Sequence, residues 1–274
     1  MTDTHTHLYI PGDFPGQEAD QAVTRAIEAG VHTLVMPNVD TESIAPLMEL
    51  RYRFPQNVYA AMGLHPTEVK NSWREDLRVI ASHLDDDGVI ALGEIGMDLY
   101  WDTAMEAAQA EAFAMQLGWA AERALPVIIH QRGALEQTLR VLDRTDTGHI
   151  PGIVFHCFTE GPESVRRIRE QLPEAFFGIG GVCTFKNAPA LRQALHEIGP
   201  GHIVLETDAP WLAPVPHRGT RNESAYIPCI LQAIAAELAI DPALLETMTD
   251  RNARRLFPAL SSSCPTDTDA PGPK

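Results

Sequence analysis

Short apolar segments alternate with longer amphipathic segments along nearly the whole chain. The apolar segments are continuous, which is typical of parallel strands buried on both faces. After an opening strand, we expect strands at 32–39, 58–66, 89–98, 126–132, 152–158, 175–181 and 202–210. We expect helices at 17–30, 41–54, 73–86, 103–123 and 134–144, one ending near 172, and others at 188–198, 223–238 and 242–257.

Eight strand–helix units in about 257 residues predict an α/β fold of the (β/α)₈ TIM-barrel type. The alternative is an open doubly wound sheet, but no G-x-G-x-x-G sequence follows the first strand. We therefore assign residues 1–258 to a single barrel domain. Residues 259–274 are rich in Ser, Pro and Asp, so we expect them to form a disordered tail.

Histidine and carboxylate side chains recur where the predicted strands end. The set comprises His5, His7, His65, Glu94, His130, His156 and Asp208. The carboxyl ends of barrel strands converge on one mouth, where barrel enzymes carry their active sites. We therefore expect these side chains to gather there, and we assign no function to the histidines elsewhere in the chain.

His5 and His7 are separated by one residue, so on a strand both imidazoles would face the same way, roughly 6–7 Å apart. A catalytic ion typically keeps about three protein ligands and a water. Six candidate ligands therefore predict two divalent ions. His5, His7 and Asp208 would hold the first ion, His130 and His156 the second, and Glu94 would bridge the two ions.

The two ions would bring four positive charges against the two negative charges of Glu94 and Asp208. Such a site would activate a water, and Asp208 would act as its general base. The metal stays open among Mg²⁺, Mn²⁺, Zn²⁺, Co²⁺ and Ni²⁺. Because the first strand begins almost at the start of the sequence, we expect the His5–His7 part of the site to be the most exposed and its ion the more easily lost.

Three further acids lie near the predicted mouth. Asp3 either contacts a ligand or caps a turn. Glu206 lies two residues before Asp208, and one interpretation is that it supports the metal ligands without binding the metal. Asp98 lies at the end of the predicted strand that carries Glu94. The sequence alone leaves these alternatives open.

Several motifs follow one known family in order. They are Asp3-Thr4-His5-Thr6-His7, Gly63-Leu64-His65-Pro66, Gly93-Glu94-Ile95-Gly96, Ile129-His130, Phe155-His156-Cys157-Phe158, Thr184-Phe185-Lys186-Asn187 and Glu206-Thr207-Asp208-Ala209-Pro210-Trp211-Leu212. From Thr2 to about Phe257 the chain resembles the TatD family of metal-dependent hydrolases. The resemblance implies deoxyribonuclease activity on phosphodiester bonds, often 3′–5′ exonucleolytic, with metal ligation by the same six residues and His65 close to the substrate.

The formal net charge of −16 disfavours extensive non-specific binding to duplex nucleic acid, since the surface repels polyanions. We therefore expect a short engaged segment of single-stranded or frayed DNA. Candidate phosphate contacts are Arg132, Lys186, Arg218 and Arg221, together with His65. The 218–224 loop reads R-G-T-R-N-E-S, which has one cation fewer than the R-G-K-R-N-E-P usual in the family.

The four cysteines form no C-x-x-C pair, which argues against a structural zinc knuckle or a disulfide framework. No apolar run reaches 18 residues and no signal-peptide pattern opens the chain. We expect a cytoplasmic protein with no membrane association and no obligate protein partner.

Two other functions remain open. One is hydrolysis of a small non-phosphate substrate, such as a lactone, ester or cyclic amide, in the same barrel. Many such enzymes bridge their metals with a carbamylated lysine, whereas none of the three lysines here occupies a predicted strand end and Glu94 stands in that place. The other is a metal-binding interaction protein without turnover.

Overall fold

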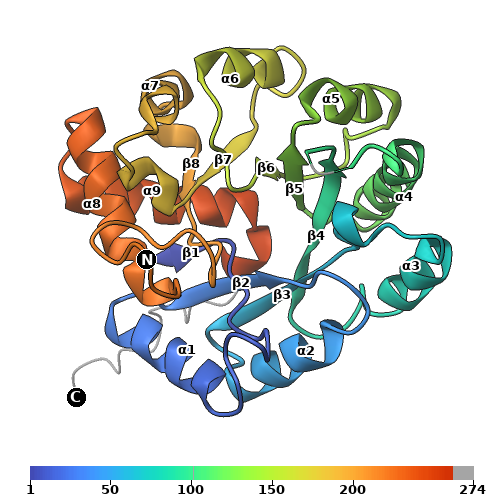
Figure 1. The fold of residues 1–274 in the computed structure, drawn as a ribbon, viewed down its shortest axis with the longest axis horizontal. Helices are drawn as coiled ribbons and strands as arrows, with labels where there is room; N and C mark the ends of the chain where they lie inside the picture. Colours follow the sequence, from blue (N-terminus) through green and yellow to red (C-terminus); the bar gives the residue numbers. More distant parts are fainter. Residues whose placement is uncertain (101, 262–274) are drawn as a thin grey trace, which may run out of the picture.

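Eight parallel strands follow one another around a barrel in sequence order, and helices lie outside them (Figure 1). The computed structural model describes residues 1–100 and 102–261. The strands are β1 (Thr2–Asp3), β2 (Thr33–Pro37), β3 (Val58–Met62), β4 (Val89–Asp98), β5 (Val127–Arg132), β6 (Ile153–Phe155), β7 (Phe176–Ile179) and β8 (Ile203–Leu205). The predicted (β/α)₈ barrel is confirmed.

All nine predicted helices are present. They are α1 (Glu18–Glu28), α2 (Ile44–Arg53), α3 (Trp73–Ala81), α4 (Glu106–Arg123), α5 (Leu135–Arg144), α6 (Pro162–Arg169), α7 (Pro189–Ile198), α8 (Ile227–Leu238) and α9 (Pro242–Leu256). Helix α3 ends five residues before the predicted boundary at 86, and several strands are shorter than predicted.

No single helix among the described residues is both long and apolar enough to cross a membrane. The segments Ser224–Leu238 and Pro242–Leu256 meet the length and composition test only when they are taken together, and they are bent by 111° relative to each other.

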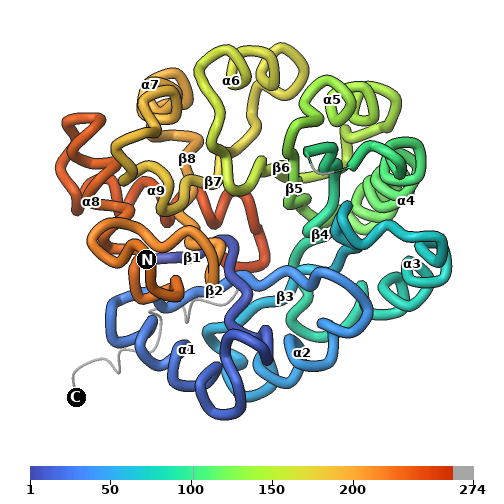
Figure 2. Tube along the Cα trace, viewed as in Figure 1, coloured from blue at the N-terminus to red at the C-terminus, as the bar shows by residue number. Residues whose placement is uncertain are grey.

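His5 and His7 follow the end of β1, as predicted, but they do not lie on the strand itself. Strand β1 ends at Asp3, and the chain then turns past the ladder. Backbone hydrogen bonds nevertheless tie this segment to the residues after β8: the Thr4 N–H donates to Leu205 O (2.9 Å) and the Asp208 N–H donates to His5 O (2.9 Å). Figure 2 shows the opening segment beside the chain that follows β8. These bonds join the first and last strands and bring the His5–His7 segment against Asp208.

Alternate strand residues pack together inside the barrel. This inner cluster consists of Val35, Tyr59, Ala61, Ile90, Ala91, Ile128, Val154, Phe176, Val204, Leu256, Phe257 and Leu260. Its last three members come from the end of the chain. A Cβ on Gly152, directly before β6, would lie 2.8 Å from the Leu256 carbonyl oxygen, so the end of α9 lies at the amino-terminal side of the strands. The end of α9 thus closes the amino-terminal end of the barrel. The carboxyl-terminal end of the strands is left to form a site.

The prediction of disorder is wrong for residues 259–261. Residues 259–261 belong to the short 3₁₀-helix Pro258–Ser261, whose Leu260 is buried in the inner cluster. Burial of Leu260 and Phe257 explains why the ordered chain continues past α9. The rest of the predicted tail, residues 262–274, lies outside the described residues.

Candidate metal centre

The inward-facing residues of the strands continue into the site at a spacing of two. His130 comes two residues after buried Ile128 in β5. Likewise, His156 lies just beyond β6, two residues after buried Val154. Successive side chains alternate between the two faces of a strand, so both imidazoles emerge at the mouth above the inner cluster. They open into a pocket of about 630 Å³, within the range of small-molecule sites.

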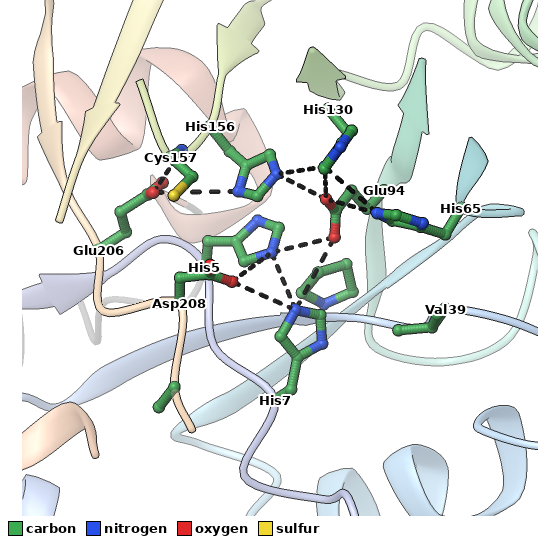
Figure 3. Close-up of polar contacts among 12 residues, drawn as sticks. His5, His7, Val39, His65, Glu94, His130, His156, Cys157, Glu206 and Asp208 are labelled. Carbon is green, nitrogen blue, oxygen red and sulfur yellow. Dashed lines mark hydrogen bonds and ion pairs between the residues drawn. The ribbon is translucent and has the colours of Figure 1, made fainter. Parts of the chain in front are cut away.

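The pocket brings together most of the predicted site residues. Those that line it are His7, His65, Glu94, His130, Arg132, His156 and Asp208. His5 lies behind the pocket wall and is fully buried. Figure 3 shows Glu94 between two sets of side chains, with His5, His7 and Asp208 on one side and His65, His130 and His156 on the other.

A break in the ladder between β4 and β5 places Glu94. The register shifts between Leu92 and Ile95, so Glu94 leaves the regular alternation. Further along, Gly96 (φ +141°) lies so close to β5 that a Cβ there would be 2.0 Å from the His130 carbonyl oxygen. Glycine at this position lets the two strands approach closely. Glu94 and His130 therefore come within hydrogen-bonding distance, at 2.7 Å.

Four polar atoms form a first ligand group: His5 Nε2, His7 Nε2, Asp208 Oδ1 and Glu94 Oε2. The two imidazole nitrogens are 3.0 Å apart. Glu94 Oε2 is 3.2 Å from His5 Nε2 and 3.8 Å from His7 Nε2, and Asp208 Oδ1 is 3.7 Å from both. Ligand atoms on a tetrahedral ion with bonds of about 2.0–2.2 Å are about 3.3–3.6 Å apart. Three of these atoms, from His5, His7 and Glu94, lie close enough together to hold one divalent cation, and Asp208 forms a similar group with His5 and His156.

Tyr9 orients His7 toward this group. The Tyr9 hydroxyl donates to the Pro37 carbonyl oxygen at 2.5 Å, and the same oxygen lies 3.1 Å from His7 Nδ1. Because the hydroxyl proton is already used, His7 Nδ1 must be the donor to Tyr9. The Nε2 lone pair of His7 then faces the first ligand group, which is the tautomer that a metal ligand requires. The sequence reasoning missed Tyr9, although its position two residues after His7 on the same segment was a signal.

Glu94 Oε1 is the centre of a second ligand group with His130 Nδ1, His156 Nε2 and His65 Nε2. The carboxylate oxygen is 2.7 Å from His130, 2.5 Å from His156 and 3.3 Å from His65. The nitrogens of His65 and His130 are 3.2 Å apart. His65 was predicted as a substrate contact, and the structure also places it within ligand distance of this group, together with Glu94 and His130.

The pKa of Glu94 lies well below its usual value. Burial alone would raise it, but the surrounding imidazoles of His156, His65 and His5 outweigh the desolvation. Glu94 is thus a buried anion that serves both groups, one oxygen to each. Burial, assisted by repulsion between the rings, lowers the pKa of His5 to about 4 and that of His7 to about 3, so both imidazoles are neutral and can act as ligands.

Asp208 differs from Glu94 in its environment. Burial and, after it, the negative charge of Glu94 together raise its pKa to about 8. A cation beside Asp208 would favour the ionised form. The donor set of both groups, five imidazoles and two carboxylates, suits Zn²⁺, Mn²⁺, Co²⁺ or Ni²⁺ by ligand chemistry. Both ligand groups therefore fit divalent metal.

Asp98 holds His130 from behind. Asp98 Oδ2 lies 2.9 Å from His130 Nε2, the nitrogen that points away from the second ligand group. Burial lowers the pKa of His130, but hydrogen bonds to Asp98 and Glu94 reverse this and raise it to about 9. Asp98 therefore fixes the ring so that Nδ1 faces Glu94. The sequence indicated Asp98 only as an acid near the mouth.

Replacing Asp98 by alanine is expected to weaken binding of the ion held by the second ligand group by about 10–100-fold, because the His130 ring loses its fixed orientation. Asp98→Asn is the matched control, since its amide oxygen still accepts from His130 Nε2. Metal affinities measured by competition with a chromophoric chelator check this. Equal weakening in both variants would contradict an orienting role.

Asp3 takes no place in either ligand group. Its carboxylate accepts hydrogen bonds from the N–H groups of His5 (3.3 Å) and Thr207 (3.0 Å), and from the Thr207 hydroxyl (2.6 Å). The turn-capping alternative left open by the sequence is thus the one observed. These bonds hold the His5 segment to the Thr207–Asp208 segment, although burial raises the Asp3 pKa to about 6.

Glu206 is fully buried behind His156. Its Oε1 accepts from the Cys157 N–H at 2.5 Å and lies 3.9 Å from His156 Nδ1, outside hydrogen-bonding distance. A Cβ on Gly178 would be 1.9 Å from Glu206 Oε2, so the absent side chain makes room for this carboxyl group. Burial, reinforced by the charge of Asp208, raises the Glu206 pKa well above its usual value. Burial therefore favours the protonated form of Glu206 more than it would for an exposed glutamate.

The predicted phosphate contacts are spread more widely than the ligands. Arg132 lines the pocket and lies over the Tyr100 ring at 4.1 Å. Arg218 stacks on Phe185 at 3.8 Å, and Lys186 borders a separate surface hollow. Arg221 donates to the Asp13 carbonyl oxygen and to Glu18, each at 2.6 Å. Arg132 and His65 are thus at the pocket, whereas phosphate contacts by Arg218, Arg221 and Lys186 stay predictions.

The expectation that His5 and His7 are the most exposed ligands is wrong. Their exposed fractions are 0% and 1%, compared with 13% for the side chain of His65 and 16% for that of His130. The segments after β8 cover them, which compensates for the position of β1 near the start of the sequence. The second ligand group is the more exposed of the two. Exposure therefore gives no support to the prediction that the ion at His5 and His7 is the more easily lost.

The chain matches known proteins over nearly its full length. A family model described as "TatD related DNase" matches residues 2–258. The metal-dependent hydrolase YabD of Bacillus subtilis, described as uncharacterized, is 34% identical over 259 residues, which cover 94% of this chain and 98% of that protein. A protein of Cronobacter sakazakii named 3′-5′ ssDNA/RNA exonuclease TatD is 34% identical over 250 residues, covering 88% and 92%. The crystal structure of YjjV, a TatD homologue of Escherichia coli, aligns with a TM-score of 0.85 at 27% identity, covering 94% of this chain and 98% of that one.

Proposed function

Because this chain belongs to the TatD-related family of metal-dependent hydrolases, we propose that it is a two-metal phosphodiesterase acting on single-stranded or frayed DNA ends. The family makes it a hydrolytic enzyme acting on ester bonds. The choice of a nucleic acid substrate is supported by the relative from Cronobacter sakazakii, which is named as an exonuclease on single-stranded DNA and RNA. Cleavage from the 3′ end is part of the proposal.

The observation that carries the proposal is the position of Glu94. Its Oε2 is 3.2 Å from His5 Nε2, and its Oε1 is 2.5 Å from His156 Nε2. A single buried carboxylate thereby joins two ligand groups. Two ions held by a shared carboxylate are the arrangement used for in-line displacement at phosphorus.

When bound, divalent ions at these groups would acidify an attacking water and neutralise phosphate charge. The residues of the chain supply the rest. Asp208 lies at the wall of the pocket, where a carboxylate kept ionised by a neighbouring cation could take a proton from the attacking water and return it to the leaving oxygen. His65 and Arg132 line the same pocket and would hold the phosphate oxygens.

The test is a substrate comparison with metal-reconstituted protein. We expect labelled single-stranded oligonucleotides to be cut in the presence of Mn²⁺, Co²⁺ or Mg²⁺ at low salt, and blunt duplexes of the same sequence to be cut more slowly. Protein treated with chelator is the control. Intact single strands under every metal would contradict the proposal.

A second candidate function is hydrolysis of a small non-phosphate substrate. It is favoured by one observation: among the described residues lining the pocket, Arg132 is the one arginine or lysine. A panel of lactones, carboxylic esters and cyclic amides, assayed beside the oligonucleotides, separates the two functions. Turnover of neither class would favour the third alternative, a metal-binding protein without catalysis.

A further inference from the structure

An exposed indole stands at the edge of the metal centre. Trp211 is 49% exposed and lines the pocket. Single exposed hydrophobic side chains are common on protein surfaces, so it is the position of Trp211 at the pocket that distinguishes it. Among the described residues, the other large hydrophobics with comparable exposure are Tyr52, Val79, Tyr100, Met115, Leu212, Val215 and Leu244. Of these only Leu212, the next residue along, also lines the pocket.

The backbone of Trp211 is held firmly while its side chain is half solvated. The Trp211 N–H donates to the Asp208 carbonyl oxygen at 3.0 Å, and the Trp211 carbonyl oxygen accepts from Asn222 Nδ2 at 2.7 Å. Asn222 is fully buried and donates also to the Thr207 carbonyl oxygen. The backbone of Trp211 is therefore held next to Asp208, while its indole has no place in the core.

One side of the indole faces the first ligand group. The Trp211 and His7 rings are 5.5 Å apart between centroids, with an interplanar angle of 65°. This edge-to-face contact occupies only part of the indole. A planar group stacked on the remaining surface would lie next to a phosphate held at the metal centre.

The charge of the pocket makes such stacking useful. The chain carries a net charge of −16, and among the described lining residues Arg132 is the one arginine or lysine. Phosphate contacts, which dominate affinity in most nucleic-acid-binding proteins, are therefore few here. Stacking of a base on an aromatic side chain supplies affinity that is independent of phosphate charge and tolerant of sequence.

We propose that Trp211 is a specificity-determining residue that stacks an unpaired nucleobase beside the scissile phosphate. The inference rests on the proposed phosphodiesterase function. A base stacked on Trp211 cannot stay paired within a duplex, so the indole selects nucleotides at single-stranded or frayed ends. Phosphodiesters that carry no base gain nothing from it.

The test compares ends with and without bases. Two labelled single strands are made with identical sequence, one with normal nucleotides at the attacked end and one with abasic nucleotides there. They are cut by the wild type, Trp211→Phe and Trp211→Leu, each reconstituted with the same metal. Val215→Ala is the matched control, because Val215 is equally exposed at 49% but does not line the pocket.

We expect Trp211→Leu to lower kcat/KM on the normal end by about 5- to 150-fold, the range for loss of one stacked base. The loss appears mainly in KM. The same variant leaves kcat/KM on the abasic end unchanged, Trp211→Phe retains most activity, and Val215→Ala behaves as the wild type on both ends.

Equal losses on both ends would overturn the inference, since the indole would then act through His7 or through folding. No loss on the normal end would also overturn it. A wild type that cuts neither strand would instead refute the proposed function, and with it the stacking role. Because the side chain is half exposed, the thermal unfolding midpoint of Trp211→Leu should stay close to that of the wild type, and this is measured in parallel.

Discussion

Replacing Glu94 with glutamine is expected to reduce hydrolysis to about a thousandth of the wild-type rate or less, because one neutral amide replaces the anion shared by both ligand groups. Glutamine has nearly the same shape, but it presents one oxygen and one NH₂ group. The NH₂ group cannot act as a ligand. In the native protein Glu94 Oε2 is 3.2 Å from His5 Nε2, and Glu94 Oε1 is 2.5 Å from His156 Nε2. Whichever way the amide turns, one of the two ligand groups loses its carboxylate oxygen.

The measurement is kcat on a labelled oligonucleotide, with bound metal determined by elemental analysis. Bound metal is expected to fall from about two to about one ion per chain. Glu206→Gln is the matched control: Glu206 is as deeply buried, but its carboxyl group accepts from the Cys157 N–H and belongs to neither ligand group. Near-normal metal content and rate in Glu94→Gln would contradict the bridging role.

Asp208→Asn is expected to lower kcat by about 10²–10⁴-fold, the usual contribution of a general base. Asparagine keeps the shape and can occupy the left-handed backbone conformation found here, with φ +54°. It cannot accept the proton that Asp208 is proposed to take. The change therefore removes the chemistry with little disturbance of the fold.

Single-turnover rates and thermal unfolding of the metal-free protein check this second effect. Asp208→Ala is the comparison, because alanine in the same backbone conformation costs about 1–2 kcal/mol, which lowers Tm by several degrees. Asp208→Asn should keep the Tm and lose the rate. Equal nuclease activity in wild type and Asp208→Asn would rule out the assigned role of Asp208.

The fold was predictable because short continuous apolar strands and longer amphipathic helices have different patterns of apolar residues. Their boundaries were less so: β6 ends at Phe155 and β8 at Leu205, several residues before the predicted ends. The apolar pattern continues past them, since Phe158 and Ala209 are buried by other contacts than the ladder. The sequence therefore indicates which residues are buried, but it does not indicate where strand pairing ends.

The ligand groups came largely from the sequence, because the spacing of residues at strand ends predicts that their side chains converge. What the sequence could not give is which atoms meet. The partnership of Asp98 with His130 crosses from β4 to β5, and that of Tyr9 with His7 depends on a turn beyond β1. The burial of His5 was also hidden, because it results from segments that lie about 200 residues away along the chain, as the Asp208–His5 hydrogen bond shows.

A titration of the metal-free protein with Mn²⁺ or Co²⁺ tests most directly the claim that two ions joined by Glu94 perform the hydrolysis. Bound metal and the rate of oligonucleotide cleavage are measured on the same samples. The rate should stay low through the first equivalent and rise to its maximum with the second. Full activity at one equivalent, or cleavage that is unchanged in metal-free protein, would contradict the two-metal account.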